Sequence, residues 1–166
     1  MNDARPRAAV ITVSDRCSAG AAEDRSGPAI VEMLRDAGLD CADPVVVPDG
    51  ADRVELALRA AIDRGARVVV TTGGTGVGPR DATPEGTRRV LTQELPGLVE
   101  EMRRVATRET PGGMLSRGLA GVARTADRPA TLVVNLPGSR AAVTSAMPVL
   151  LTVVQHAVAQ LDGAGH

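Results

Sequence analysis

The sequence contains no Phe, Tyr or Trp among its 166 residues. Any hydrophobic core must therefore be built from aliphatic side chains and methionine, and the chain has no aromatic face on which a flat ligand could stack. Lysine is absent as well, because all 19 basic residues are arginine. This excludes the P-loop, a nucleotide-binding loop whose lysine reaches the phosphates of the ligand.

An excess of charge of one sign is also lacking, since 19 basic and 20 acidic residues give a net charge of −1. A nucleic-acid surface needs a basic stripe, so we expect no nucleic-acid partner. There is no uninterrupted apolar run near 18 residues and no signal-peptide pattern at the start, so we expect a cytoplasmic protein with no membrane partner. The two cysteines, Cys17 and Cys41, are far apart and lack a histidine spaced to complete a metal site.

The hydrophobic pattern predicts alternating strands and helices in a single domain that covers residues 1–166, with 1–6 flexible. Strands are expected at 8–13, 44–47, 67–72, 121–125 and 130–136. Helices are expected at 26–37, where Ser26 is the cap, and at 51–64, 84–93, 97–107 and 139–161, the last kinked or split by Pro148. A loop is expected at 14–24 and a helical turn at 114–119. The first three strands alternate with helices, which predicts an α/β fold: a three-layer α/β/α sandwich around a mostly parallel sheet.

The most informative segment is 68–83, where a β-branched strand runs into four glycines within six positions and then Asp81. Glycines let backbone N–H groups approach an anion closely, because no Cβ stands in the way. A helix that begins near Thr83 adds N–H groups without helical partners and a positive dipole end. We therefore predict a phosphate site with a place for a metal ion. The glycine spacing does not match the dinucleotide fingerprint.

Polar residues follow the ends of four predicted strands. Because the carboxyl ends of parallel strands meet at one edge of a sheet, these residues should line a single crevice. They are Ser14 and Asp15, then Asp49, then Thr72, Gly73, Gly74, Thr75 and Gly76, and finally Pro137, Gly138 and Ser139.

Six short motifs together resemble one family. They are T-V-S-D-R at 12–16, V-P-D at 47–49, T-T-G-G-T-G at 71–76, R-D-A-T-P-E at 80–85, S-R-G at 116–118 and N-L-P-G-S at 135–139. The sequence is similar to the molybdopterin adenylyltransferases of the MogA/MoaB type, within the molybdenum-cofactor biosynthesis family that also includes the domain fused within gephyrin. The resemblance runs from about Val10 to the final helix. One departure is the pair Arg140 and Ala141, where the family often has Pro and then Lys.

This resemblance implies transfer of AMP from ATP onto the terminal phosphate of molybdopterin, with release of pyrophosphate. It implies that Asp49 and Asp81 are the catalytic carboxylates and the ligands of Mg²⁺, which usually binds few protein oxygens. It further implies that Ser116, Arg117 and Ser139 hold the pterin and its phosphate, Arg117 through a two-pronged hydrogen bond. The expected assembly is a trimer, or a hexamer as in related members, that hands its product to a molybdenum-insertion protein.

Two other functions stay open. One is a pterin-binding paralogue without transferase activity, although the presence of both aspartates favours the active form. The other is a nicotinamide-dependent oxidoreductase, which would lack its fingerprint and an obvious proton donor. Structural roles are also open: Asp81 could cap the following helix, Asp49 could serve only its turn, Ser116 could begin a helix, and Asp15 could pair with Arg16.

Overall fold

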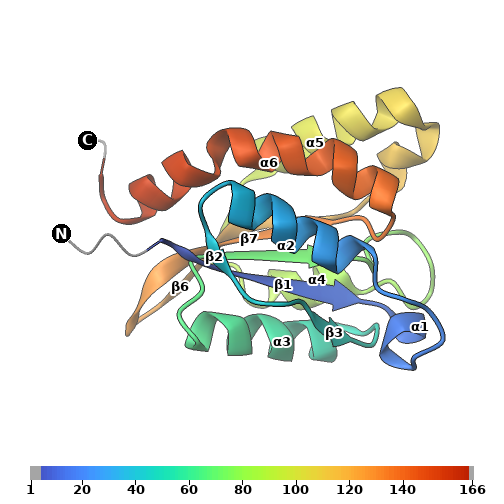
Figure 1. Cartoon of the computed structure of the whole chain (residues 1–166), viewed down its shortest axis with the longest axis horizontal. Helices are drawn as coiled ribbons and strands as arrows, with labels where there is room; N and C mark the ends of the chain where they lie inside the picture. Colours follow the sequence, from blue (N-terminus) through green and yellow to red (C-terminus); the bar gives the residue numbers. More distant parts are fainter. Residues whose placement is uncertain (1–4, 165–166) are drawn as a thin grey trace.

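The computed structural model describes residues 5–164 and shows a seven-stranded sheet between two layers of helices (Figure 1). The strands are β1 (Arg7–Val13), β2 (Asp40–Cys41), β3 (Val45–Val47), β4 (Val68–Thr72), β5 (Gln93–Glu94), β6 (Ala120–Thr125) and β7 (Arg128–Leu136). The helices are α1 (Asp15–Ser18), α2 (Ser26–Asp36), α3 (Ala51–Asp63), α4 (Thr83–Arg88), α5 (Pro96–Glu109) and α6 (Arg140–Leu161), with a 3-10 helix, η1 (Pro111–Leu115).

The sheet has the order β2-β1-β4-β7-β6-β5, and β3 also pairs with β1. All pairings among β1, β2, β3, β4 and β7 are parallel, whereas β6 is antiparallel to β7 and to β5. From β1 the chain first builds β2 and β3 on one side and then returns to build β4 on the other side. This reversal next to β1 is the kind of place where ligands bind in open α/β sheets. The predicted α/β fold with a mostly parallel sheet is confirmed.

Alternate residues of each central strand pack into opposite layers. Val68 and Val70 of β4 contact the layer of α2, α5 and α6, while Val69 contacts the layer that contains α3. Figure 1 shows these helices on the two faces of the sheet. With no aromatic residues, the largest fully buried side chains are aliphatic or methionine, including Ile30, Leu58 and Met147.

The last helix, α6, is long and apolar enough to cross a membrane by length and composition. Polar residues such as Thr152, Gln155 and His156 interrupt its apolar residues, so the expectation of no uninterrupted apolar run near 18 residues still holds. Within the fold, α6 buries a stripe at helical spacing that includes Val143, Met147, Leu150 and Val154, and this stripe belongs to the core on one face of the sheet. Pro148 lies inside this helix without splitting it, so of the two predicted effects, a kink or a split, the split is wrong.

Several other predicted boundaries also differ from the structure. The loop at 14–24 contains α1, the helix predicted at 84–93 ends at Arg88, and β2 and β5 were not foreseen. The turn predicted at 114–119 is η1, which ends before Ser116. Ser26 is not a cap, because the carboxylate of Asp24 accepts the N–H of Gly27 at 2.9 Å. The flexibility predicted for 1–6 concerns mainly residues 1–4, which lie outside the described residues.

Candidate functional site

A cavity of about 730 Å³ opens at the carboxyl ends of β1, β3, β4 and β7. This is the edge at which the polar strand ends were expected to meet, and the structure brings most of them together there. The predicted residues that line the cavity are Ser14, Asp49, Thr72, Gly73, Gly74, Thr75, Gly76, Asp81, Ser116, Pro137, Gly138 and Ser139. Asp15 and Arg117 are not part of the lining.

The glycine loop, defined here as residues 73–78, is tied down through its carbonyl groups. The carbonyls of residues 73 and 74 accept hydrogen bonds from the hydroxyl and the backbone N–H of Thr83, at 2.9 and 3.0 Å. The carbonyls of residues 75 and 76 accept from the backbone N–H and from Nε of Arg117, both at 2.8 Å. Four consecutive carbonyl groups are thus engaged by the protein.

The N–H groups of the same loop are in the opposite situation. Within residues 5–164, no protein acceptor is found for the N–H groups of Gly74, Thr75 or Gly76. Gly73 and Gly74 adopt φ values of 100° and 65°, which favour glycine and curl the backbone. Successive free N–H groups on a curled backbone form an anion-binding concavity. The geometry therefore supports the predicted phosphate site.

Asp49 is held by a reciprocal contact with Asp15. One oxygen of Asp49 accepts the N–H of Asp15 at 2.9 Å, and one oxygen of Asp15 accepts the N–H of Asp49 at 3.1 Å. Arg80 donates to both oxygens of Asp15, at 3.0 and 3.1 Å, and to the carbonyl of Asp49 at 3.1 Å. The hydrogen bond from Arg80 is the main cause that lowers the pKa of Asp15. Asp15 therefore pairs with Arg80 and orients Asp49.

Asp81 reaches the same cavity from the other side of the glycine loop. Its Oδ2 accepts the N–H of Gly78 at 2.9 Å. The cap position of α4 is Ala82, and no side chain caps this helix, so Asp81 is not its cap. Among residues 5–164, neither Oδ1 of Asp81 nor Oδ1 of Asp49 receives a protein hydrogen bond. Each carboxylate thus has one fixed oxygen and one available oxygen.

These two carboxylates suit Mg²⁺ that is bound together with a nucleotide. No group of three or more His, Cys, Asp or Glu residues within the described part of the chain could hold a metal ion by itself. Mg²⁺ on phosphates usually takes only one or two carboxylates from the protein and fills its other positions with phosphate oxygens and water. The available oxygens of Asp49 and Asp81 match that requirement.

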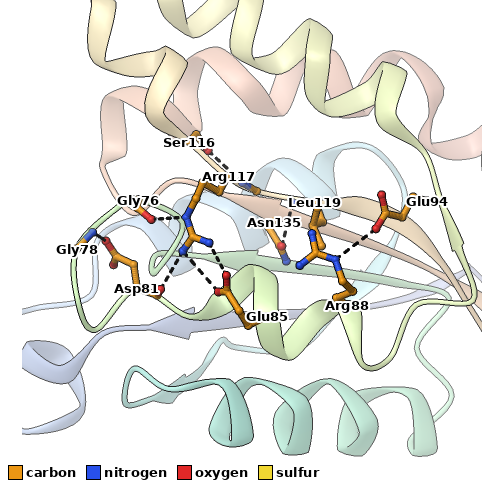
Figure 2. A network of polar contacts seen from close by, with 11 residues as sticks. Gly76, Gly78, Asp81, Glu85, Arg88, Glu94, Ser116, Arg117, Leu119 and Asn135 are labelled. Atoms are coloured by element: carbon orange, nitrogen blue, oxygen red, sulfur yellow. Dashed lines mark hydrogen bonds and ion pairs between the residues drawn. The ribbon is translucent and has the colours of Figure 1, made fainter.

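Arg117 is not among the residues that line the cavity, and Figure 2 shows its guanidinium directed at Gly76, Asp81 and Glu85. Its Nε donates to the carbonyl of Gly76 at 2.8 Å, and one terminal nitrogen donates to the carbonyl of Asp81 at 2.9 Å. Both terminal nitrogens also donate to the carboxylate of Glu85. All three nitrogens of the fork are thus engaged within the protein, and the predicted contact with a substrate phosphate would require at least one of them to exchange its partner. The neighbouring Ser116 does line the cavity.

Comparison with known proteins identifies the family. The family model described as a probable molybdopterin binding domain matches residues 9–156. The chain belongs to this family. The resemblance of its motifs to that family is thereby confirmed.

Similar proteins and solved structures support this family assignment. A molybdenum cofactor biosynthesis bifunctional protein of Synechococcus elongatus is 40% identical over 159 residues, which are 96% of this chain and 48% of that protein. A molybdopterin adenylyltransferase of Helicobacter pylori is 36% identical over 155 residues, 90% of this chain and 84% of that protein. The solved structure of the molybdopterin biosynthesis Mog protein from Mycobacterium ulcerans matches with a TM-score of 0.86 at 40% identity, covering 94% of this chain and 99% of that one. The chain spans about half the length of the bifunctional relatives.

The sequence pattern did not predict two clusters of polar side chains that hold the strand ends around the cavity in place. The buried amide of Asn135 donates to the hydroxyls of Thr71 and Thr87, at 2.9 and 3.0 Å, and so joins the ends of β4 and β7 to α4. The carboxylate of Asp24 accepts the hydroxyl of Thr12 at 2.7 Å and holds the start of α2 against β1. The sequence offered one signal for both clusters: Thr12, Thr71 and Asn135 are polar residues near the ends of strands that are otherwise apolar.

The two cysteines provide a test of the cavity. Burial raises the pKa of Cys41 to about 11, so this thiol should react slowly at neutral pH. Cys17 is half-buried and lines the cavity. We expect a thiol reagent to label one cysteine of the folded protein rapidly, and mass spectrometry of peptides to identify it as Cys17. Mg²⁺-ATP should slow the labelling of Cys17. If Mg²⁺-ATP binds to the protein and the rate of labelling stays the same, the nucleotide binds outside this cavity.

Proposed function

We propose that this chain catalyses the Mg²⁺-dependent transfer of AMP from ATP to the terminal phosphate of molybdopterin. The observation that carries the proposal is the glycine loop, where the N–H groups of residues 74–76 have no acceptor within residues 5–164. Two carboxylates that each keep one oxygen available lie close to the loop. The identity of the reaction is supported by relatives named molybdopterin adenylyltransferase, which are 36% identical over most of this chain.

The reaction joins two anions, so the site must bind phosphate groups and reduce their repulsion. A phosphate oxygen of molybdopterin attacks the α-phosphorus of ATP, the bond from that phosphorus to the bridging oxygen breaks, and pyrophosphate leaves. Because the attacking group is already an anion, no general base is required, and no histidine is among the described residues that line the cavity. When bound, Mg²⁺ supplies positive charge to the phosphate oxygens.

The residues of the chain have separate tasks in this proposal. The N–H groups of Gly74, Thr75 and Gly76 bind phosphate oxygens of the nucleotide. The available oxygens of Asp49 and Asp81 hold Mg²⁺. Hydrogen bonds to Thr83, Arg117, Asp15 and Gly78 hold these groups in place, so they need little rearrangement before the reaction.

A part of the cavity wall next to the glycine loop is suited to the second anion. It contains Ser116, the turn at 137–139 and the start of α6, where Ser139 accepts the N–H of Ala142 at 3.1 Å. Arg140 also lines this wall, and none of the ion pairs within residues 5–164 involves it. A helix start and an arginine without an acidic partner both favour a phosphate. We assign this wall to the terminal phosphate of molybdopterin.

The test is release of pyrophosphate by the purified protein. With Mg²⁺-ATP and molybdopterin, we expect pyrophosphate and adenylylated molybdopterin in equal amounts, and neither product when molybdopterin or Mg²⁺ is left out. Binding of both substrates without any pyrophosphate would instead identify an inactive paralogue of the same family. Failure to bind ATP would exclude the proposed reaction.

A further inference from the structure

We propose that Arg117 is a positioning residue for the nucleotide end of the cavity: it fixes the direction of the N–H donors of the glycine loop and the place of Asp81. The inference rests on the proposed function for the identity of the ligand, but its structural part can be tested without any substrate.

The argument starts from the peptide group. In a trans peptide the carbonyl of one residue and the N–H of the next point in opposite directions from one rigid plane. The carbonyls of residues 73, 74 and 75 are bonded to Thr83 and to the backbone of Arg117, so the N–H groups of residues 74, 75 and 76 must point the other way. By the same rule, the bond from Nε of Arg117 to the carbonyl of Gly76 directs the N–H of Val77.

Such anchoring is needed because of the glycines. Glycine occupies positive and negative φ about equally well, so a peptide group next to a glycine can rotate at a lower cost than one between two other residues. A rotated peptide would present a carbonyl oxygen to the phosphate in place of an N–H group. Arg117 opposes this rotation at two successive peptide groups, with its backbone N–H at Thr75 and its guanidinium at Gly76. A substitution of the side chain keeps the first contact and removes the second, together with the contact to Asp81.

The guanidinium also holds the carboxylate side of the site. One of its terminal nitrogens donates to the carbonyl of Asp81 at 2.9 Å, next to the carboxylate that is assigned to Mg²⁺. Glu85 on the first turn of α4 accepts from both terminal nitrogens and so keeps the fork in place (Figure 2). The hydrogen bond from Arg117 is also the main cause that lowers the pKa of Glu85.

The residue type follows from this geometry. Three acceptors lie around one side chain: the carbonyls of Gly76 and Asp81 and the carboxylate of Glu85. A planar guanidinium can donate to all three at once, whereas the single ammonium group of a lysine cannot reproduce the fork. If Arg117 served only as the ion-pair partner of Glu85, a lysine could replace it. Comparing arginine with lysine at this position therefore tests the proposal.

The experiment compares Arg117→Ala, Arg117→Lys and a matched control, Arg88→Ala. Arg88 lies on the same helix as Glu85, and its ion pair, with Glu94 at 3.6 Å, leads away from the cavity. We expect both Arg117 variants to raise the dissociation constant of Mg²⁺-ATP, measured by calorimetry, by about tenfold or more. The constant for molybdopterin should change by less than about threefold. The Arg88 variant should behave as the parent protein.

Backbone ¹⁵N relaxation of the parent protein and the three variants, measured without ligand, reports the internal motion of the glycine loop and does not depend on activity. We expect faster internal motion at residues 75–78 in both Arg117 variants and none in the control, with an unchanged fold by circular dichroism. A lysine variant that keeps both rigid backbone and ATP affinity would overturn the proposal, since the ion pair alone would then suffice. Loss of molybdopterin affinity with ATP affinity intact would overturn it as well, because Arg117 would then be a substrate ligand. If the parent protein binds no ATP, the proposed function fails, and the relaxation data still decide the positioning role.

Discussion

Replacing Gly74 with valine is expected to abolish nucleotide binding while the protein stays folded. Gly74 has a φ of 65°, and a Cβ added there would lie 2.3 Å from the hydroxyl oxygen of Thr83 and 3.1 Å from Oδ1 of Asp49. The first contact breaks the anchor of the glycine loop, and the second displaces the oxygen assigned to Mg²⁺. The N–H groups that should bind phosphate would lose their direction at the same time.

Calorimetric titration with Mg²⁺-ATP would show this as a loss of affinity of about 100-fold or more, equivalent to ~3 kcal/mol. The backbone strain of a side chain at this φ costs about 1–3 kcal/mol, which a typical domain can lose without unfolding. Gly20→Val is a matched control, because Gly20 has a similar φ of 73° but no atom within 4 Å of an added Cβ. The control should reproduce the part of the stability loss that comes from backbone strain, without the steric clashes at Gly74, and should retain ATP binding. If Gly74→Val binds ATP as the parent protein does, the glycine loop is structural and the nucleotide binds elsewhere.

The central part of the fold could be predicted from the sequence because its pattern is strong. The β-branched runs at β1, β4 and β7 are long and apolar, and the stripe of α3 has ideal helical spacing. The strands β2 and β5 have only two residues each, and their pairing depends on neighbours that sequence periodicity does not reveal. At Pro148, packing in the core outweighs the local tendency of proline to break a helix. Met147 and Leu150, on either side of it, are fully buried. Burial of such side chains stabilises by about 1.5–3 kcal/mol each, similar to the cost of proline inside a helix.

The place of the site was also predictable, whereas the partners of its side chains were not. The parallel sheet alone requires that the ends of β1, β3, β4 and β7 share one edge. Nothing in the sequence shows that Arg117 meets Gly76, which lies 41 residues earlier, or that Asp15 and Asp49 exchange hydrogen bonds across 34 residues. A motif identifies which donors are present. Whether those donors point to a ligand or to the protein is decided by long-range packing.

The second large effect is expected when the carboxylate of Asp49 or Asp81 is replaced by an amide. Asp81→Asn and Asp49→Asn are each expected to lower turnover by about 100-fold or more, a loss of ~2.7 kcal/mol in the transition state. Asparagine keeps the shape of the side chain and an oxygen that can accept the N–H of Gly78 or of Asp15, so the loop geometry should survive. What it removes is the negative charge of the oxygen assigned to Mg²⁺.

Steady-state release of pyrophosphate at several Mg²⁺ concentrations tests this expectation, because the Mg²⁺ needed for half-maximal rate should rise in both variants. Molybdopterin affinity should stay close to that of the parent protein, since its phosphate is assigned to Ser116, the turn at 137–139 and Arg140 and not to the two aspartates. Asp127→Asn is the matched control: this aspartate is exposed in the turn between β6 and β7 and does not line the cavity. A turnover within about threefold of the parent value, a difference below ~1 kcal/mol, would remove that aspartate from the catalytic role. If only the Asp49 variant keeps its turnover, Asp49 would serve its contact with Asp15, and Asp81 alone would hold the metal.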